Sequence, residues 1–180
     1  MTKKVLIVSS SLRGGSNSEI LAHEAERGAK DAGNAVEFLS LKGKDIKFCI
    51  GCLACQKTGK CVQKDDMADM IGKVQNADVL IFATPIYYYE LSGQLKTFLD
   101  RCNPLFEQEN KFKDVYLITS SYDDAENASD TAAKGLQGWI TCFEQSRLAG
   151  VLAGGGVNEP KDAASREDLL QKAYELGKNV

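Results

Sequence analysis

The sequence alternates short, nearly continuous hydrophobic runs with segments whose apolar residues recur at helical spacing. The runs "KVLIVS", "DVLIFAT" and "DVYLITS" cover residues 4–9, 78–84 and 114–120, and "AVEFL" and "RLAGVLAG" cover residues 35–39 and 147–154. Near-continuous apolar strands are typical of a parallel sheet that is covered on both faces. The pattern therefore predicts five strands, three of which are near-continuous apolar runs of this kind.

Helices are expected between these strands. The apolar stripes at helical spacing are Leu21, Ala25, Gly28, Ala29 and Ala32; Met67, Met70, Ile71 and Val74; Leu91, Leu95, Phe98, Leu99 and Cys102; and Ala132, Leu136, Trp139, Ile140 and Phe143. A last helix is predicted over residues 162–178, and Asp65 and Asp66 are candidate caps for the helix that follows them. Strand–helix units in series predict an α/β fold, a doubly wound five-stranded parallel sheet with helices on both faces.

The chain length of 180 residues suits one domain over residues 1–180, with one irregular insertion at residues 43–64. The formal charge is −3, from 22 basic and 25 acidic residues without long single-sign runs, so no nucleic-acid-binding face is expected. The first apolar run, Val5 to Val8, is too short for a signal peptide or a membrane span. We therefore expect a cytoplasmic protein with reduced thiols, in which structural disulfides are improbable.

The loops that follow the strands carry the polar residues. In open parallel sheets, ligands bind outside the carboxyl ends of the strands. After the first strand, "SSSLRGGSNS" leads into a helix, where hydroxyl and N–H groups suit a phosphate and Arg13 offers a charged contact. A plain polar turn with Ser16 or Asn17 as the N-cap is the alternative. Neither a phosphate loop of the nucleoside triphosphatases nor a dinucleotide fingerprint is present, so a monophosphate ester is the candidate ligand.

Three consecutive tyrosines follow the third strand, in "TPIYYYELSGQLKTFLDR". Aromatic side chains beside a phosphate site suit a flat ring system, although a core-packed tyrosine pair is the alternative. The loop after the fourth strand, "TSSYDD", offers further hydroxyl groups to the same edge.

Four of the six cysteines lie within "CIGCLACQKTGKC", at Cys49, Cys52, Cys55 and Cys61. Three close thiolates with a fourth nearby match the needs of a [4Fe–4S] cluster, whereas structural zinc usually takes two separated pairs. A cluster, a zinc ion and a loop without metal all stay open. Cys102 and Cys142 fall on apolar helical faces and are expected to be ordinary buried cysteines.

Taken together, "SLRGGSNS", "CIGCLACQKTGKCVQKDDM" and "TPIYYYELSGQLKTFLDR" resemble the flavodoxin-like NAD(P)H-dependent FMN reductases, and the cysteine block is similar to that of the iron–sulfur flavoproteins. The resemblance covers nearly the whole chain. It implies an FMN phosphate site, a site for the isoalloxazine and ribityl chain, a third flavin loop and four cluster ligands. These are, in that order, Ser11, Arg13, Ser16, Asn17 and Ser18; Pro85, Ile86, Tyr87, Tyr88 and Tyr89; Ser120, Ser121 and Tyr122; and Cys49, Cys52, Cys55 and Cys61. Ser10 departs from the glycine that many such reductases carry there.

The function implied is an FMN-dependent oxidoreductase that passes electrons from NAD(P)H or ferredoxin to an acceptor. The alternatives are a non-enzymatic electron carrier with FMN and a [4Fe–4S] cluster, or a flavin-only redox module. The resemblance also implies a homodimer or a tetramer. No residue is a candidate acid–base catalyst, because the only histidine, His23, lies within the first predicted helix.

Overall fold

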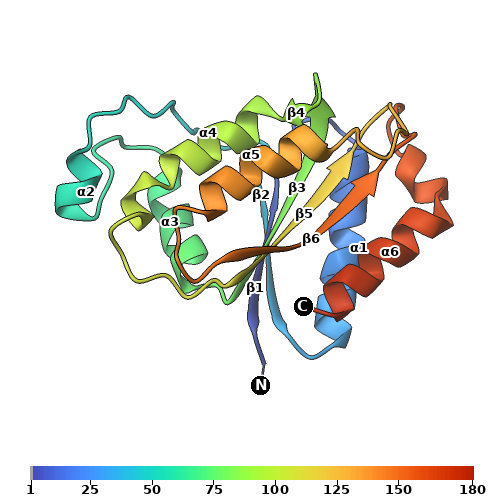
Figure 1. The fold of residues 1–180 in the computed structure, drawn as a ribbon, viewed down its shortest axis with the longest axis horizontal. Helices are drawn as coiled ribbons and strands as arrows, with labels where there is room; N and C mark the ends of the chain where they lie inside the picture. Colours follow the sequence, from blue (N-terminus) through green and yellow to red (C-terminus); the bar gives the residue numbers. More distant parts are fainter. Residues whose placement is uncertain (1) are drawn as a thin grey trace.

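Five parallel strands form the centre of the computed structural model, which describes residues 2–180 (Figure 1). They are β1 (Lys4–Ser9), β2 (Ala35–Ser40), β3 (Val79–Tyr87), β5 (Asp114–Ser120) and β6 (Arg147–Gly154). Their order in the sheet is β2-β1-β3-β5-β6. The chain adds strands first to one side of β1 and then, from β3 onward, to the other side, which is the doubly wound arrangement of flavodoxin-like folds. The predicted fold class is confirmed. The sequence reading missed one element, the short strand β4 (Glu90–Leu91), which pairs antiparallel with β3.

Helices cover both faces of the sheet. Helices α1 (Asn17–Asp31) and α6 (Glu167–Lys178) lie on one face, and α3 (Met67–Asn76), α4 (Gly93–Arg101) and α5 (Asp130–Ile140) lie on the other. Successive residues of β1 supply the two cores in turn: Val5 and Ile7 pack toward α1, and Leu6 and Val8 pack toward α3 and α4. This alternation explains why the buried strands are apolar at most positions.

Helices α1 and α6 approach closely through glycines. A Cβ added at Gly177 would stand 1.9 Å from the carbonyl oxygen of Ala25, and one at Gly28 would stand 2.0 Å from that of Tyr174. Only glycine fits at these two positions, so the apolar stripe that includes Gly28 is a helix–helix contact as well as a core face.

Several predicted boundaries are wrong. Leu91 belongs to β4, and α4 begins only at Gly93, because Ser92 caps its amino end by accepting the N–H of Leu95. The predicted helix over residues 162–178 is divided into a 3-10 turn, η2 (Asp162–Ser165), and α6, because the backbone of Arg166 leaves the helical region.

The prediction of two buried cysteines outside the cluster motif is half right. Cys102 is buried at the end of α4, and this burial raises the pKa of its thiol. Cys142 is exposed, because α5 ends at Ile140 and the next residues turn outward.

The insertion contains a short helix that the sequence reading did not include, α2 (Ala54–Thr58). We call residues 43–64 the cysteine segment. Figure 1 shows α2 at one end of the long axis of the molecule, with α1 and α6 at the other end. None of the helices within residues 2–180 has the length and apolar character needed to cross a bilayer.

Candidate functional site

The loop after β1 buries most of the residues predicted to hold a phosphate. Ser11, Ser16, Asn17 and Ser18 are buried, whereas Arg13 is exposed. Ser16 is the N-cap of α1, since its Oγ accepts the N–H of Glu19 at 3.3 Å, and it also lies 3.1 Å from Oγ of Ser18. The N-cap role that the sequence offered as the alternative is therefore present together with the cluster of hydroxyl groups.

Hydrogen-bond donors remain free in this loop. Within residues 2–180, the N–H groups of Asn17 and Ser18 have no acceptor, as expected for the first turn of a helix. Oγ of Ser9, at the end of β1, is buried and also without a partner. The free amides at this helix amino end fit an anionic phosphate ester.

The segment after β6 supports this loop. Nδ2 of Asn17 donates to the carbonyl oxygen of Glu159 at 3.0 Å, and its Oδ1 accepts the N–H of Ala163 at 3.1 Å. Nη1 of Arg13 donates to the carbonyl oxygen of Asn158 at 2.6 Å. The side chains of Asn17 and Arg13 thus bind protein groups here, and the assignment of Arg13 to a phosphate stays a prediction.

The three tyrosines form a tight hairpin between β3 and β4. Strand β3 continues through Pro85 and Ile86 to Tyr87, so only Tyr88 and Tyr89 are loop residues. Both have positive φ, 50° and 64°, the conformation that a two-residue type I′ turn requires and that side chains other than Asn, Asp or Gly seldom adopt. All three rings are exposed, and Tyr88 is fully so. The alternative of a core-packed tyrosine pair is wrong.

A hydrogen bond joins the hairpin to the loop after β5. Oη of Tyr89 donates to Oδ2 of Asp123 at 2.9 Å. The N–H of Ala125 and this hydroxyl group lower the pKa of Asp123, and the same bond raises the pKa of Tyr89. The second and third predicted flavin loops are therefore in direct contact.

The loop after β5 also contacts the strand beyond it. Ser120 and Ser121 are buried, and the N–H of Ser121 donates to the carbonyl oxygen of Gly154 at 3.0 Å. Tyr122 is exposed. A Cβ at Gly155 would stand 2.8 Å from Cα of Asp124, so this glycine lets the two loops lie against each other.

Ser10 has a role that the sequence did not reveal. Its Oγ lies 3.1 Å from the carbonyl oxygen of Ala83 and 2.9 Å from Oγ of Ser92. Ser92 also donates its N–H to Oγ1 of Thr84 at 3.1 Å. Ser10 therefore ties β1, β3 and the start of α4 together. We call the joined loops after β1, β3, β5 and β6 the carboxyl edge.

The four cysteines of the cysteine segment surround one small cavity. Its volume is about 20 Å³, and Cys49, Cys52, Cys55 and Cys61 all line it. Cys55 is buried, Cys61 is half-buried and the other two are exposed. No group of three or more His, Cys, Asp or Glu side chains in residues 2–180 is arranged closely enough to hold a single metal ion. A cluster needs wider spacing, because its thiolates bind four separate irons.

A buried ion pair holds the cysteine segment to α4. Nη1 of Arg101 lies 2.5 Å from Oδ2 of Asp65, Nη2 lies 2.9 Å from Oδ1, and both side chains are almost fully buried. The guanidinium of Arg101, which donates two hydrogen bonds, lowers the pKa of Asp65 to about 2. Asp65 also accepts the N–H of Lys47 at 2.9 Å. The pair therefore joins both ends of the cysteine segment to the body of the protein.

Sequence reasoning interpreted Asp65 only as a helix cap and overlooked Arg101. The N-cap residue of α3 is Asp66, whose side chain makes no capping bond, whereas Asp65 accepts the N–H of Met67 at 3.2 Å. One signal in the sequence could have indicated the pair: Arg101 lies beside Cys102, which belongs to an apolar helical stripe. An arginine that is buried with such a stripe needs a partner of opposite charge.

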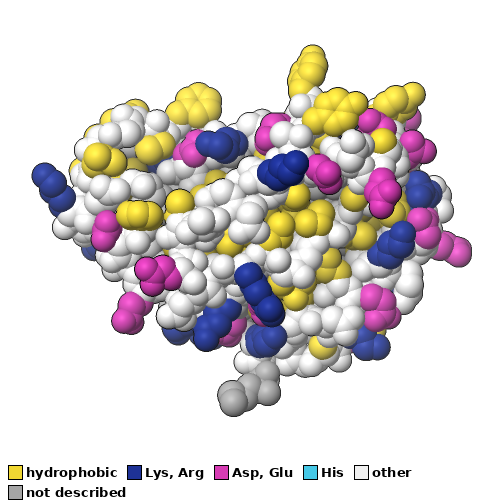
Figure 2. All heavy atoms as spheres, viewed as in Figure 1, with side chains coloured by type: hydrophobic (Ala, Val, Ile, Leu, Met, Phe, Trp, Pro, Cys, Tyr) yellow, Lys and Arg dark blue, Asp and Glu magenta, His cyan; other side chains and the backbone are white. Residues whose placement is uncertain are grey.

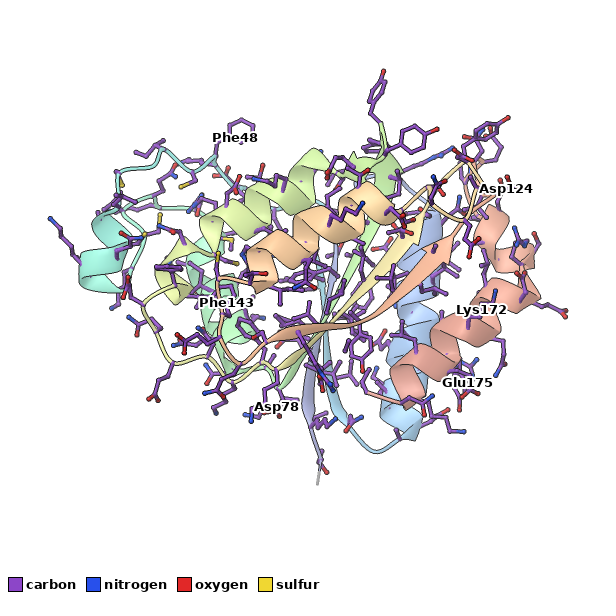
Figure 3. The ribbon with its side chains drawn as sticks, viewed as in Figure 1. Phe48, Asp78, Asp124, Phe143, Lys172 and Glu175 are labelled. Atoms are coloured by element: carbon purple, nitrogen blue, oxygen red, sulfur yellow. The ribbon has the colours of Figure 1, made fainter. Side chains whose placement is uncertain are left out.

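The carboxyl edge and the cysteine segment are separate but connected. Phe48, before the first cysteine, and Asp124, after β5, lie far apart along the long axis of the molecule (Figure 3). A groove of about 310 Å³ is lined by residues of both regions, among them Leu12 from the β1 loop and Phe48 from the cysteine segment.

Comparison with known proteins decides the family. A sequence profile described as NADPH-dependent FMN reductase matches residues 3–144. The chain belongs to the NADPH-dependent FMN reductase family. A protein of Methanocaldococcus jannaschii described as an iron–sulfur flavoprotein is 30% identical over 98% of this chain and 95% of its own. An Archaeoglobus fulgidus protein described in the same way is 37% identical over 57% of this chain and 46% of its own.

The fold is similar to that of solved oxidoreductases. The NAD(P)H:quinone oxidoreductase from Methanothermobacter marburgensis superposes with a TM-score of 0.73 at 17% identity, covering 99% of this chain and 97% of its own. Family and fold together make this protein an FMN-dependent oxidoreductase of the iron–sulfur flavoprotein branch. The predicted resemblance is confirmed, whereas the individual ligand assignments stay predictions.

Proposed function

We propose that this oxidoreductase takes electrons from NAD(P)H or ferredoxin at an FMN bound to the carboxyl edge, and exchanges them through a [4Fe–4S] cluster in the cysteine segment. FMN supplies two-electron chemistry that can be divided into single-electron steps, and a cluster carries one electron at a time. The observation that carries the proposal is the meeting of three loops at one edge, joined by the contacts of Ser10 with Ser92 and of Tyr89 with Asp123.

The residues present fit FMN. The phosphate would lie at the free amides of Asn17 and Ser18, beside Ser11 and Ser16. The isoalloxazine would lie along the exposed tyrosine hairpin, where aromatic rings and backbone groups suit a flat, partly polar ligand. The remaining predicted contacts are Pro85, Ile86, Ser120, Ser121 and Tyr122.

The residues present also fit a cluster. Four thiols line one cavity, and N–H donors of Arg101 and Asn103 contact two of the four sulfur atoms. Similar proteins described as iron–sulfur flavoproteins support the same assignment. A flavin-only redox module, in which the four cysteines stay free thiols, is the second candidate.

One preparation separates these candidates. Protein purified without oxygen is analysed for iron and FMN per chain, and its flavin is released by acid and identified by chromatography. We expect one FMN and four irons. No iron would favour the flavin-only module, and FAD in place of FMN would contradict the flavin assignment. Reduction by ferredoxin without turnover on NAD(P)H or any acceptor would indicate an electron carrier.

Single alanine variants test the ligands. Replacing Cys49, Cys52, Cys55 or Cys61 should remove the iron and its broad visible absorbance while FMN stays bound, since the two sites share no residue. Cys102→Ala and Cys142→Ala are matched controls and should keep the iron. Four cysteine variants that match the parent spectrum would refute the cluster.

The proposal includes a cytoplasmic homodimer or tetramer. Large apolar side chains are exposed around both regions, and Figure 2 shows hydrophobic atoms gathered over the β4 hairpin and at the α2 end. Exposed apolar patches of this kind are usually covered by a partner. Light scattering tests the assembly: a flavin-bound monomer would contradict it.

A further inference from the structure

Two nitrogen donors outside the cysteine segment reach two of its sulfur atoms. Nη2 of Arg101 lies 3.5 Å from Sγ of Cys61, and Nδ2 of Asn103 lies 3.1 Å from Sγ of Cys55. Arg101 ends α4, and Asn103 begins the 3-10 turn η1 (Asn103–Leu105). Both donors thus belong to the body of the protein and approach the cysteine cavity from the same stretch of chain.

The guanidinium of Arg101 has a second donor on the Cys61 side. Its outer N–H groups form the fork that binds both carboxylate oxygens of Asp65. Because a guanidinium is planar, the other hydrogen of Nη2, which faces Cys61, is parallel to the N–H of Nε. Nε is buried and has no partner within residues 2–180. An unpaired buried N–H therefore faces the side on which Cys61 lies, where sulfur is the acceptor at hand.

Asp65 fixes the guanidinium in this orientation. It holds Arg101 through two hydrogen bonds, and Arg101 donates a third bond to the carbonyl oxygen of Lys47 at 2.7 Å. Arg101 is only 1% exposed, so it has no room to rotate away. The donor to Cys61 is therefore preorganised before any ligand binds.

We propose that Arg101 and Asn103 are positioning residues of the iron–sulfur site: they orient the Cys61 and Cys55 thiolates and raise the reduction potential of the cluster these thiolates bind. This inference rests on the proposed function. Reduction adds one electron, and hence one negative charge, to the cluster and its thiolates. Hydrogen bonds and positive charge at the sulfur atoms stabilise that added charge, so they favour the reduced form.

The test is a potentiometric titration of the anaerobically purified full-length protein, with the reduced cluster followed by electron paramagnetic resonance and FMN by absorbance. Asn103→Ala should shift the cluster to a more negative potential by about 59 mV, a tenfold change in the ratio of reduced to oxidised cluster. Asn103→Asp keeps the shape but replaces the donor by an acceptor, so its shift should be larger. Arg101→Lys keeps the positive charge but loses the planar group that donates to both Asp65 and Cys61, so it should also shift the cluster to a more negative potential. In the double variant with Asn103→Ala, the two shifts should add.

Two matched variants serve as controls. Arg147→Lys alters an exposed arginine–aspartate pair, with Asp114, and Asn76→Ala removes an amide that donates only to the carbonyl oxygen of Gly72. Neither residue lies in the cysteine segment, so neither should move the cluster potential. The FMN potential should be unchanged in every variant.

The outcomes separate the two proposals. A parent protein without iron overturns the cluster and this inference together. A parent with a cluster, but with Asn103→Ala and Asn103→Asp at the parent potential, overturns this inference alone and leaves the proposed function standing. Because Asn103 is only partly buried and lies outside the ion pair, its variants decide the question even if Arg101→Lys fails to fold.

Discussion

The carboxyl edge and the cysteine segment are built in opposite ways. At the carboxyl edge, loops leave adjacent strands and are joined by backbone bonds, such as those from Ser121 to Gly154 and from Lys161 to Gly15. The cysteine segment has one short helix and is held largely by the pair of Arg101 and Asp65. One region therefore owes its geometry to the sheet, whereas the other is held to the body of the protein by a few side-chain contacts, of which this ion pair is the most buried.

The largest effect we expect is on the segment, from Arg101→Met. This change leaves the buried carboxylate of Asp65 without its charged partner, and breaking a buried ion pair in this way typically costs about 3–5 kcal/mol. Urea unfolding of the iron-free protein measures the loss, and FMN affinity should change little. In the control, adding Asp65→Asn should restore part of the stability. A single variant as stable as the parent would mean that the segment is held by other contacts.

Acid should weaken the same contact. The pKa of Asp65 is lowered to about 2 by Arg101, from an ordinary value near 4, so the folded state favours the carboxylate. Its contribution to stability is present above the ordinary pKa of an aspartate and is lost as the pH falls toward 2. The stability difference between the parent and Asp65→Asn should therefore shrink over that range. Asp123→Asn, at a carboxylate outside any ion pair, is the control and should show a much smaller dependence on pH.

These two regions were also unequally predictable. The apolar runs predicted all five parallel strands, and most clearly the three inner ones, β1, β3 and β5, because strands buried on both faces are apolar at nearly every position. The predicted strands in turn indicated the carboxyl edge, because ligands of open parallel sheets bind at the carboxyl ends of the strands. The β4 hairpin was missed because three adjacent tyrosines contain none of the glycine, asparagine or aspartate residues that usually mark a two-residue turn.

The support of the cysteine segment was beyond sequence reasoning for a different reason. Asp65 and Arg101 are 36 residues apart, and nothing in local periodicity pairs them. Spacing predicted that the four cysteines gather, and they do line one cavity. The donors from Asn103 and Arg101 depend on how α4 ends against the segment, which only the fold determines.

A smaller effect should follow from Gly155→Ala at the carboxyl edge. The added Cβ would stand 2.8 Å from Cα of Asp124, a backbone atom that moves only if the loop after β5 shifts. We expect FMN affinity to fall about tenfold, or ~1.4 kcal/mol, with the iron content unchanged. Fluorescence titration of FMN into the flavin-free protein measures this. Gly138→Ala, where a Cβ meets open space on α5, is the control and should bind FMN normally.

The smallest effect should come from Arg13→Ala. This variant tests whether side chains of the carboxyl edge contribute to FMN affinity beyond the backbone N–H groups. Arg13 is exposed and already donates to the carbonyl oxygen of Asn158, with Glu159 3.7 Å away. An exposed ion pair contributes at most about 1 kcal/mol, so FMN should bind only about fivefold more weakly. Riboflavin lacks the phosphate and should bind equally well to parent and variant.

Glu159→Gln is the matched control: removing a carboxylate near the phosphate site should leave FMN affinity unchanged or slightly higher. Equal losses for FMN and riboflavin would instead assign Arg13 to the support of residues 158–159, and the phosphate would then be held by the α1 amides and serine hydroxyl groups alone.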